Sequence, residues 1–215
     1  MFSLLAIFLA LFPPLQSPPR GQLVDDLVDG VTRTYSKLTD FSASFEQILT
    51  DPSNQRQVER GLLYLARKDK KMRFDYQTPV RKSYYSDGKT YTAYVPATKQ
   101  AVQTPVGKAV DDRLQIFQVL VGNAEWRRQY PVYKEQLQDA PVTAGNRVVR
   151  MFPTRKDLPE VLLEINPKTY LIHRFGMRYS DGENSEFRLS DLKTTKLDPA
   201  IFNFKVPPGV DLVRE

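Results

Sequence analysis

The stretch DFSASFEQ, residues Asp40–Gln47, decides the fold that the sequence predicts. Its odd-numbered positions Phe41, Ala43 and Phe45 are apolar, whereas Ser or Glu occupies the even-numbered positions between them. Strict alternation of this kind is typical of a β-strand with one buried and one exposed face. The chain is therefore expected to enter a sheet here, with both phenylalanines on the buried side.

Further strands are expected directly after it. RGLLYLAR follows a turn at Asp51–Asn54, and MRFDY places Met72, Phe74 and Tyr76 on one face. In VRKSYYSDGKTYTAYV, the pair Asp87-Gly88 between Tyr- and Thr-rich runs predicts a hairpin with a two-residue turn. In that register Tyr84 pairs with Tyr91 on the same face.

Strands resume in the second half of the chain. NRVVRMFP, EVLLEINP, YLIHRFGMRYSDGE and SEFRLSDLKTT read as strands separated by turn residues. Successive strands joined by short turns predict an antiparallel meander, and a sheet of this size curls. The expected fold class is α+β, mainly antiparallel β, as an incomplete, half-open β-barrel of about ten or eleven strands.

Two helices are expected to accompany the sheet, with a short third one at AEWRRQY. Apolar residues at helical spacing predict an amphipathic N-terminal helix from Gln22 to Leu38, although Gly30 inside it costs about 1 kcal/mol relative to Ala. The stretch DDRLQIFQVLVGN, Asp111–Asn123, is apolar almost all round, with Asp111 or Asp112 as its N-cap and Gly122 as its end. We expect it to lie over the open sheet as a lid.

An incomplete barrel under a lid can enclose an apolar cavity for acyl chains. The alternative is that the same side chains pack against one another and leave no cavity. The candidate cavity residues on strands are Phe41, Phe45, Leu63, Leu65, Met72, Phe74, Tyr76, Tyr84 and Tyr91, and those on the lid are Leu114, Phe117, Leu120 and Val121.

Composition argues against an enzyme and against a cofactor or metal. The chain has no cysteine, which excludes disulfides, thiol nucleophiles and lipid attachment at a processed N-terminal cysteine. Its one histidine, His173, alternates with apolar residues in a strand pattern. Asp111-Asp112 is more simply a helix cap than an acid pair.

Two segments bear on where the protein is located and on its partners: the apolar N-terminus and a basic stretch. Met1–Phe12 fits the apolar region of a signal peptide, so we expect a signal peptide and Pro-rich linker over residues 1–20, one domain over 21–215, and export. An N-terminal anchor that is left uncleaved and a misassigned start codon are the alternatives.

The net charge of +6 is concentrated in ARKDKKMR, Ala66–Arg73. This stretch is either a solvated hairpin loop or a patch for an acidic partner or phospholipid surface, rather than for nucleic acid.

Several motifs, taken in order, resemble the outer-membrane lipoprotein carrier (LolA) family. They are Phe-x-Ala-x-Phe-x-Gln (Phe41–Gln47), Gly61 opening the next strand, Arg-Phe-x-Tyr-x-x-Pro (Arg73–Pro79), Ser-Asp-Gly-Lys (Ser86–Lys89), Tyr-x-Pro (Tyr94–Pro96) and the ending FNFKVPPGVDL. The resemblance spans Leu38 to Leu212.

The resemblance implies a periplasmic, monomeric carrier that moves acylated lipoproteins between membranes. It implies an inner-membrane ABC-type release complex as donor and a lipid-anchored outer-membrane lipoprotein as acceptor. It also implies that an arginine holds the lid shut, and Arg67 matches that position. The family usually has Pro after this arginine, but here Lys68 follows, so Arg73 and Arg60 remain alternatives.

Two other functions stay open from the sequence. One is a carrier of another amphiphile, such as a glycolipid or a specialised lipid. The other is a lipid-sensing regulator with the same fold, whose known examples carry a further C-terminal domain.

Overall fold

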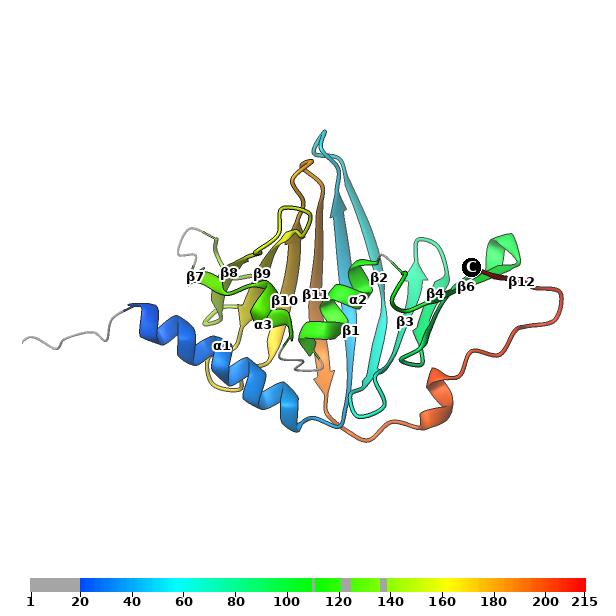
Figure 1. Cartoon of the computed structure of the whole chain (residues 1–215), viewed down its shortest axis with the longest axis horizontal. Coiled ribbons are helices and arrows are strands. Elements are labelled where there is room, and N and C mark those ends of the chain that lie inside the picture. The colour runs from blue at the N-terminus through cyan, green and yellow to red at the C-terminus, as the bar shows by residue number, and fades with distance from the viewer. Residues whose placement is uncertain (1–19, 110, 121–124, 136–138) are drawn as a thin grey trace, which may run out of the picture.

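The computed structural model describes residues 20–109, 111–120, 125–135 and 139–215. These residues form a single sheet of twelve strands with three α-helices and two short 3₁₀ helices (Figure 1). The expected signal peptide, Gly122 and Val121 lie outside the described residues.

The sheet is open, with β12 at one edge and β7 at the other. Its order is β12-β6-β5-β4-β3-β2-β1-β11-β10-β9-β8-β7, and every pair is antiparallel except β12 with β6. The strands are β1 (Asp40–Thr50), β2 (Arg56–Ala66), β3 (Lys71–Thr78), β4 (Lys82–Ser86), β5 (Thr90–Val95), β6 (Gln100–Pro105), β7 (Val132–Glu135), β8 (Arg147–Phe152), β9 (Glu160–Ile165), β10 (Ile172–Arg178), β11 (Asn184–Lys193) and β12 (Asp211–Arg214).

The three α-helices lie over one face of this sheet (Figure 1). They are α1 (Arg20–Lys37), α2 (Asp112–Leu120) and α3 (Glu125–Gln129), and the 3₁₀ helices are η1 (Pro96–Thr98) and η2 (Pro199–Phe202). Their apolar side chains and those of the strands form one buried cluster. We call this side the helix-covered face and the other side the outer face. No helix among the described residues is both long enough and apolar enough to span a bilayer.

The expected fold class is confirmed, with twelve strands where the pattern indicated about ten or eleven. β7 and β12 are short edge strands of four residues each, next to β8 and β6. So few residues do not establish an alternating pattern, and each strand is recognised only through its partner. The predicted N-terminal helix is present but begins at Arg20 and ends at Lys37.

The predicted register of the β4–β5 hairpin is wrong by two residues. Tyr84 pairs with Ala93, and Tyr91 pairs with Ser86. The loop is longer than a two-residue turn because the Asp87 carboxylate accepts hydrogen bonds from the backbone N–H groups of Lys89 (2.8 Å) and Thr90 (2.7 Å). A shift by an even number of residues keeps Tyr84 and Tyr91 on the same face.

The outer face carries polar and charged side chains instead of a helix layer. Glu164 is fully buried there and accepts hydrogen bonds from the backbone of Val142 (2.8 Å) and Thr143 (2.9 Å), with Arg174 at 3.1 Å. Burial would raise the pKa of this carboxyl group, but the hydrogen bonds and Arg174 lower it below its usual value. The two faces of the sheet therefore differ sharply in chemistry.

Candidate functional site

A continuous row of aromatic side chains crosses the helix-covered face. We define the aromatic row as Phe187 on β11, Phe45 on β1, Tyr76 on β3, Tyr84 on β4 and Tyr91 on β5. Neighbouring ring centroids are 5.8, 4.8, 5.6 and 6.1 Å apart along the row. The strand alternation that predicted buried positions also places these rings on the same face of the sheet. Between Phe45 on β1 and Tyr76 on β3 lies β2, where Gly61 has no side chain and lets the two rings meet.

The predicted cavity residues that the structure describes lie together in this region. Ten of them are buried members of the core cluster, and Tyr84 is partly buried and packs against it. The side chain of Phe117 and the whole of Val121 lie outside the described parts of the chain. The ten are Phe41, Phe45, Leu63, Leu65, Met72, Phe74, Tyr76, Tyr91, Leu114 and Leu120. Their role as a lipid cavity stays a prediction.

The helix predicted as a lid, α2, contributes its apolar side chains to the same cluster. Leu114, Ile116, Val119 and Leu120 are all buried. Asp111 caps the helix, because its carboxylate accepts a hydrogen bond from the backbone N–H of Arg113 at 2.8 Å. One of the two expected capping residues is thereby confirmed.

Arg113 attaches the first turn of α2 to the aromatic row. Its guanidinium donates hydrogen bonds to the hydroxyl oxygens of Tyr76 (2.8 Å) and Tyr91 (3.3 Å), and it pairs with Asp111 at 2.7 Å. Tyr91 in turn donates to Asp111 at 2.6 Å. The same guanidinium lies 3.6 Å from the centroid of the Tyr84 ring. Polar contacts on an otherwise apolar face thus hold this end of the helix.

A buried polar chain continues from this contact into the sheet. Tyr76 donates its hydroxyl proton to the side-chain oxygen of Gln47, whose amide donates to Ser185 at 3.1 Å. Gln47 and Ser185 are both almost fully buried. The strand alternation could have revealed Gln47, since it occupies the next inward position after Phe41, Ala43 and Phe45.

Two more contacts anchor the helices. Asp112 accepts a hydrogen bond from the Tyr179 hydroxyl, which lies just after β10. Arg127 on α3 pairs with Asp29 on α1 at 2.5 Å and donates to Tyr133 at 3.1 Å. The helices are therefore tied both to the sheet and to each other.

Burial keeps the phenols of this site protonated. It raises the pKa values of Tyr76, Tyr91 and Tyr179 well above the usual value for tyrosine. Burial would lower the pKa of Arg113, but its interactions with Tyr76 and Asp111 raise it instead. The phenols thus remain hydrogen-bond donors and Arg113 remains a cation at all ordinary pH values.

The predicted latch, Arg67, lies in the turn after β2. Its backbone N–H donates to the carbonyl of Thr39 at 2.8 Å, and its role as a latch stays a prediction. The two alternatives are on the outer face, where Arg60 pairs with Glu46 at 2.7 Å and Arg73 pairs with Asp75 at 2.8 Å. Sequence reasoning missed Arg113, the arginine that contacts the aromatic row from α2.

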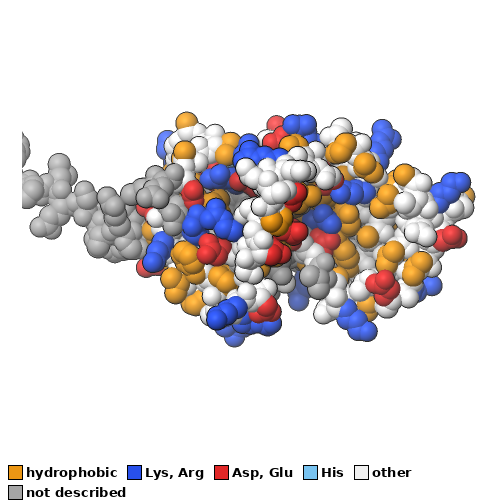
Figure 2. Space-filling model, turned by 90° about the horizontal axis from the view of Figure 1, so that it is seen from above, with side chains coloured by type: hydrophobic (Ala, Val, Ile, Leu, Met, Phe, Trp, Pro, Cys, Tyr) orange, Lys and Arg blue, Asp and Glu red, His pale blue; other side chains and the backbone are white. Residues whose placement is uncertain are grey.

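The basic stretch Ala66–Arg73 spans the β2–β3 turn. Within it, Lys68 and Asp69 line a pocket of about 390 Å³ together with Lys196, Leu197 and Phe202. Seen from above, the surface shows basic side chains interspersed with acidic and apolar ones (Figure 2). A partner for the basic stretch stays a prediction.

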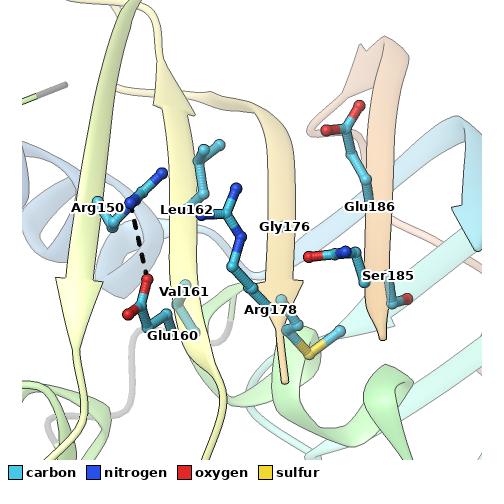
Figure 3. A pocket seen from close by; sticks show the side chains of 10 residues that line it. Arg150, Glu160, Val161, Leu162, Gly176, Arg178, Ser185 and Glu186 are labelled. Carbon is cyan, nitrogen blue, oxygen red and sulfur yellow. Dashed lines mark ion pairs between the residues drawn. The ribbon is translucent and has the colours of Figure 1, made fainter. Parts of the chain in front are cut away.

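The outer face has a small charged pocket over β8–β11. Arg150, Glu160, Arg178 and Gly176 line about 70 Å³ of space, and Arg150 pairs with Glu160 at 3.8 Å (Figure 3). This space is too small for an acyl chain. Among the described residues, no group of His, Asp or Glu side chains is arranged to hold a metal ion.

Fold and site together define a class of protein in which helices shelter the aromatic face of an open antiparallel sheet. The model of the family described as outer membrane lipoprotein carrier protein LolA matches residues 36–205. The chain therefore belongs to the LolA family.

Relatives agree with this assignment, and a solved structure shares the fold. The outer-membrane lipoprotein carrier protein of Chromohalobacter salexigens is 24% identical over 210 residues, which is 96% of each chain. That of Glaesserella parasuis is 25% identical over 177 residues, covering 82% of this chain and 79% of the relative. An uncharacterized conserved protein from Thermus thermophilus has a TM-score of 0.57 at 15% identity, covering 89% of this chain and 99% of that chain. At this identity the last likeness concerns the fold alone.

Proposed function

We propose that this chain is a carrier, and not an enzyme, that shields the acyl chains of lipoproteins on the helix-covered face. It would move them through the periplasm from the inner to the outer membrane. Membership of the LolA family and the names of the relatives support this proposal. The observation that carries it is the aromatic row under α2, a helix that polar contacts attach at its first turn.

The free energy gained by burying an acyl chain is large enough to offset the hydrogen bonds that hold α2 on the sheet. Burying an acyl chain is worth about 0.8 kcal/mol per methylene, or on the order of 10 kcal/mol for a whole chain. Each hydrogen bond to a charged group such as Arg113 contributes about 1.5–3 kcal/mol. Because the side chains of the aromatic row contact one another here, we infer that this is the closed state. When α2 moves away, burial of acyl chains against the exposed row would offset the free energy of detaching the helix.

The partners follow from the same proposal. An inner-membrane ABC-type complex would load the carrier, and an outer-membrane acceptor lipoprotein would unload it by binding the chains more tightly. The carrier would act as a monomer without a cofactor. A carrier of a different amphiphile is the second candidate, since the aromatic row does not select a head group by shape alone.

A solubility assay tests the proposal. Purified triacylated lipoprotein is diluted out of detergent with or without the chain, and soluble complex is measured by gel filtration. We expect a one-to-one complex with the acylated form and none with the same lipoprotein lacking its acyl groups. Aggregation of the lipoprotein despite the chain, or equal binding of the non-acylated form, would contradict lipoprotein carriage. Mass spectrometry of co-purified lipid would identify any other amphiphile.

A further inference from the structure

Three tyrosines surround the guanidinium of Arg113. Its central carbon lies 3.6 Å from the Tyr84 ring centroid and 5.4 Å from that of Tyr76. Its Nε donates to the Tyr91 hydroxyl oxygen at 3.3 Å. The Tyr84 and Tyr91 rings are nearly parallel, with an angle of 18° between them. Aromatic faces and phenol oxygens around a buried cation are the features of an aromatic cage.

The cage and the cation belong to different elements. The tyrosines are held by strand pairing, with Tyr76 opposite Lys82, Tyr84 opposite Ala93 and Tyr91 opposite Ser86. Arg113 and its partner Asp111 are at the start of α2. If α2 leaves the sheet, it removes Arg113 and its counter-charge Asp111 together, and the three rings stay in place. Lys82 on β4 stays as well, with its Nζ 4.6 Å from the Tyr76 ring centroid and paired with Glu59 at 2.8 Å, so the faces of Tyr84 and Tyr91 are the ones that Arg113 vacates.

We propose that Tyr76, Tyr84 and Tyr91 form a binding site for the cationic head group of an amphiphile, and that Arg113 fills this site in the closed state. The inference rests on the proposed function, because a ligand enters only when α2 moves. The chemical class is a quaternary or primary ammonium group attached to an acyl or alkyl chain.

The position of the cage agrees with such a ligand. Tyr84 is partly exposed, whereas Phe45 and Phe187 further along the aromatic row are buried. An ammonium group in the cage would leave its chain directed along the row. A cationic head group also replaces the cation–π contacts that Arg113 gives up, which an uncharged head group does not do.

Two probes with the same chain test the cage. Dodecyltrimethylammonium carries a cation, and dodecyldimethylamine oxide carries a head group of similar size without net charge at neutral pH. Calorimetry below their micelle concentrations should give about fivefold tighter binding of the ammonium probe by the unmodified chain. The net charge of +6 opposes this preference, so overall electrostatic attraction does not explain it.

Variants separate the cage from the rest of the face. Tyr84→Leu keeps apolar volume and should bind both probes equally. Tyr85→Leu is the matched control, because Tyr85 is the next residue on β4 but contacts Arg73 and Phe204 on the outer face, and the preference should remain. Arg113→Gln should empty the cage and increase the preference for the ammonium probe.

The outcomes distinguish this inference from the function on which it rests. Equal binding of both probes by the unmodified chain, or a preference that survives in Tyr84→Leu, overturns the cage and leaves the carrier intact. An Arg113→Gln variant with no increased preference also counts against the cage. Failure of both probes to bind overturns the carrier and the cage together.

Discussion

Arg113 attaches the first turn of α2 to the sheet. It is a charged side chain with only 13% of its surface exposed, on a helix that contributes Leu114, Ile116, Val119 and Leu120 to the buried cluster. Its buried charge is compensated by Asp111 and by the hydroxyls of Tyr76 and Tyr91. Removing its guanidinium weakens the attachment of α2 to the sheet but leaves the strand pairing within the sheet in place.

Replacing Arg113 by Gln should loosen α2 without unfolding the sheet. We expect amide hydrogen exchange in residues 112–120 to accelerate about tenfold, and the affinity for a fluorescent fatty acid to rise by a similar factor, since more molecules are open. Arg60→Gln is the control, because Arg60 is exposed on the outer face and pairs with Glu46. Unchanged exchange in α2 would show that Arg113 does not hold it.

At the scale of single residues, the sequence predicted what depends on local pattern and missed what depends on long-range contacts. Alternation along single strands placed Phe41, Phe45 and Phe74 on the buried side, because it depends on backbone geometry alone. The contact of Arg113 with Tyr76 joins residues 37 positions apart. It depends on how α2 crosses the sheet, which no periodicity encodes.

At the scale of elements, Gly30 shows how packing overrides propensity. The sequence marks it as a weak point of the N-terminal helix. In the structure, a Cβ at Gly30 would lie 2.1–2.6 Å from the ring atoms of Tyr170, in the turn between β9 and β10. The glycine lets α1 approach this turn closely. The short edge strands β7 and β12 went unpredicted for a related reason, since their partners define them.

Gly30→Ala should therefore destabilise the protein, although alanine is the better helix former. Displacing the Tyr170 ring should lower the free energy of unfolding by about 1–3 kcal/mol, measured by urea denaturation. Gly107→Ala is the control, because a Cβ there meets no atom within 4 Å, and we expect a change within about 0.5 kcal/mol. A gain in stability for Gly30→Ala would mean that the ring moves aside freely.

For the whole molecule, the arrangement permits opening without unfolding. The ladder from β12 to β7 is continuous through strand pairing and does not include the helices. α2 contacts the sheet through side chains, and its described polar anchors include Tyr91 on one half of the sheet and Tyr179 near the other. A movement of α2 would expose the aromatic row and leave every strand pair intact.

Locking α2 to the sheet should then block acyl binding. Because the chain has no cysteine, Asp112→Cys with Tyr179→Cys introduces a unique thiol pair that a cleavable bis-maleimide can bridge. We expect the bridged protein to lose affinity for a fluorescent fatty acid by at least about tenfold, and cleavage of the spacer to restore it. The matched control is Glu46→Cys with Arg60→Cys, which are register partners on the outer face. Bridging that pair leaves α2 free and should change the affinity by less than about twofold. If the Asp112–Tyr179 bridge left binding unaffected, acyl chains would be entering by a route that does not require α2 to move, and the closed state would not be a barrier to loading.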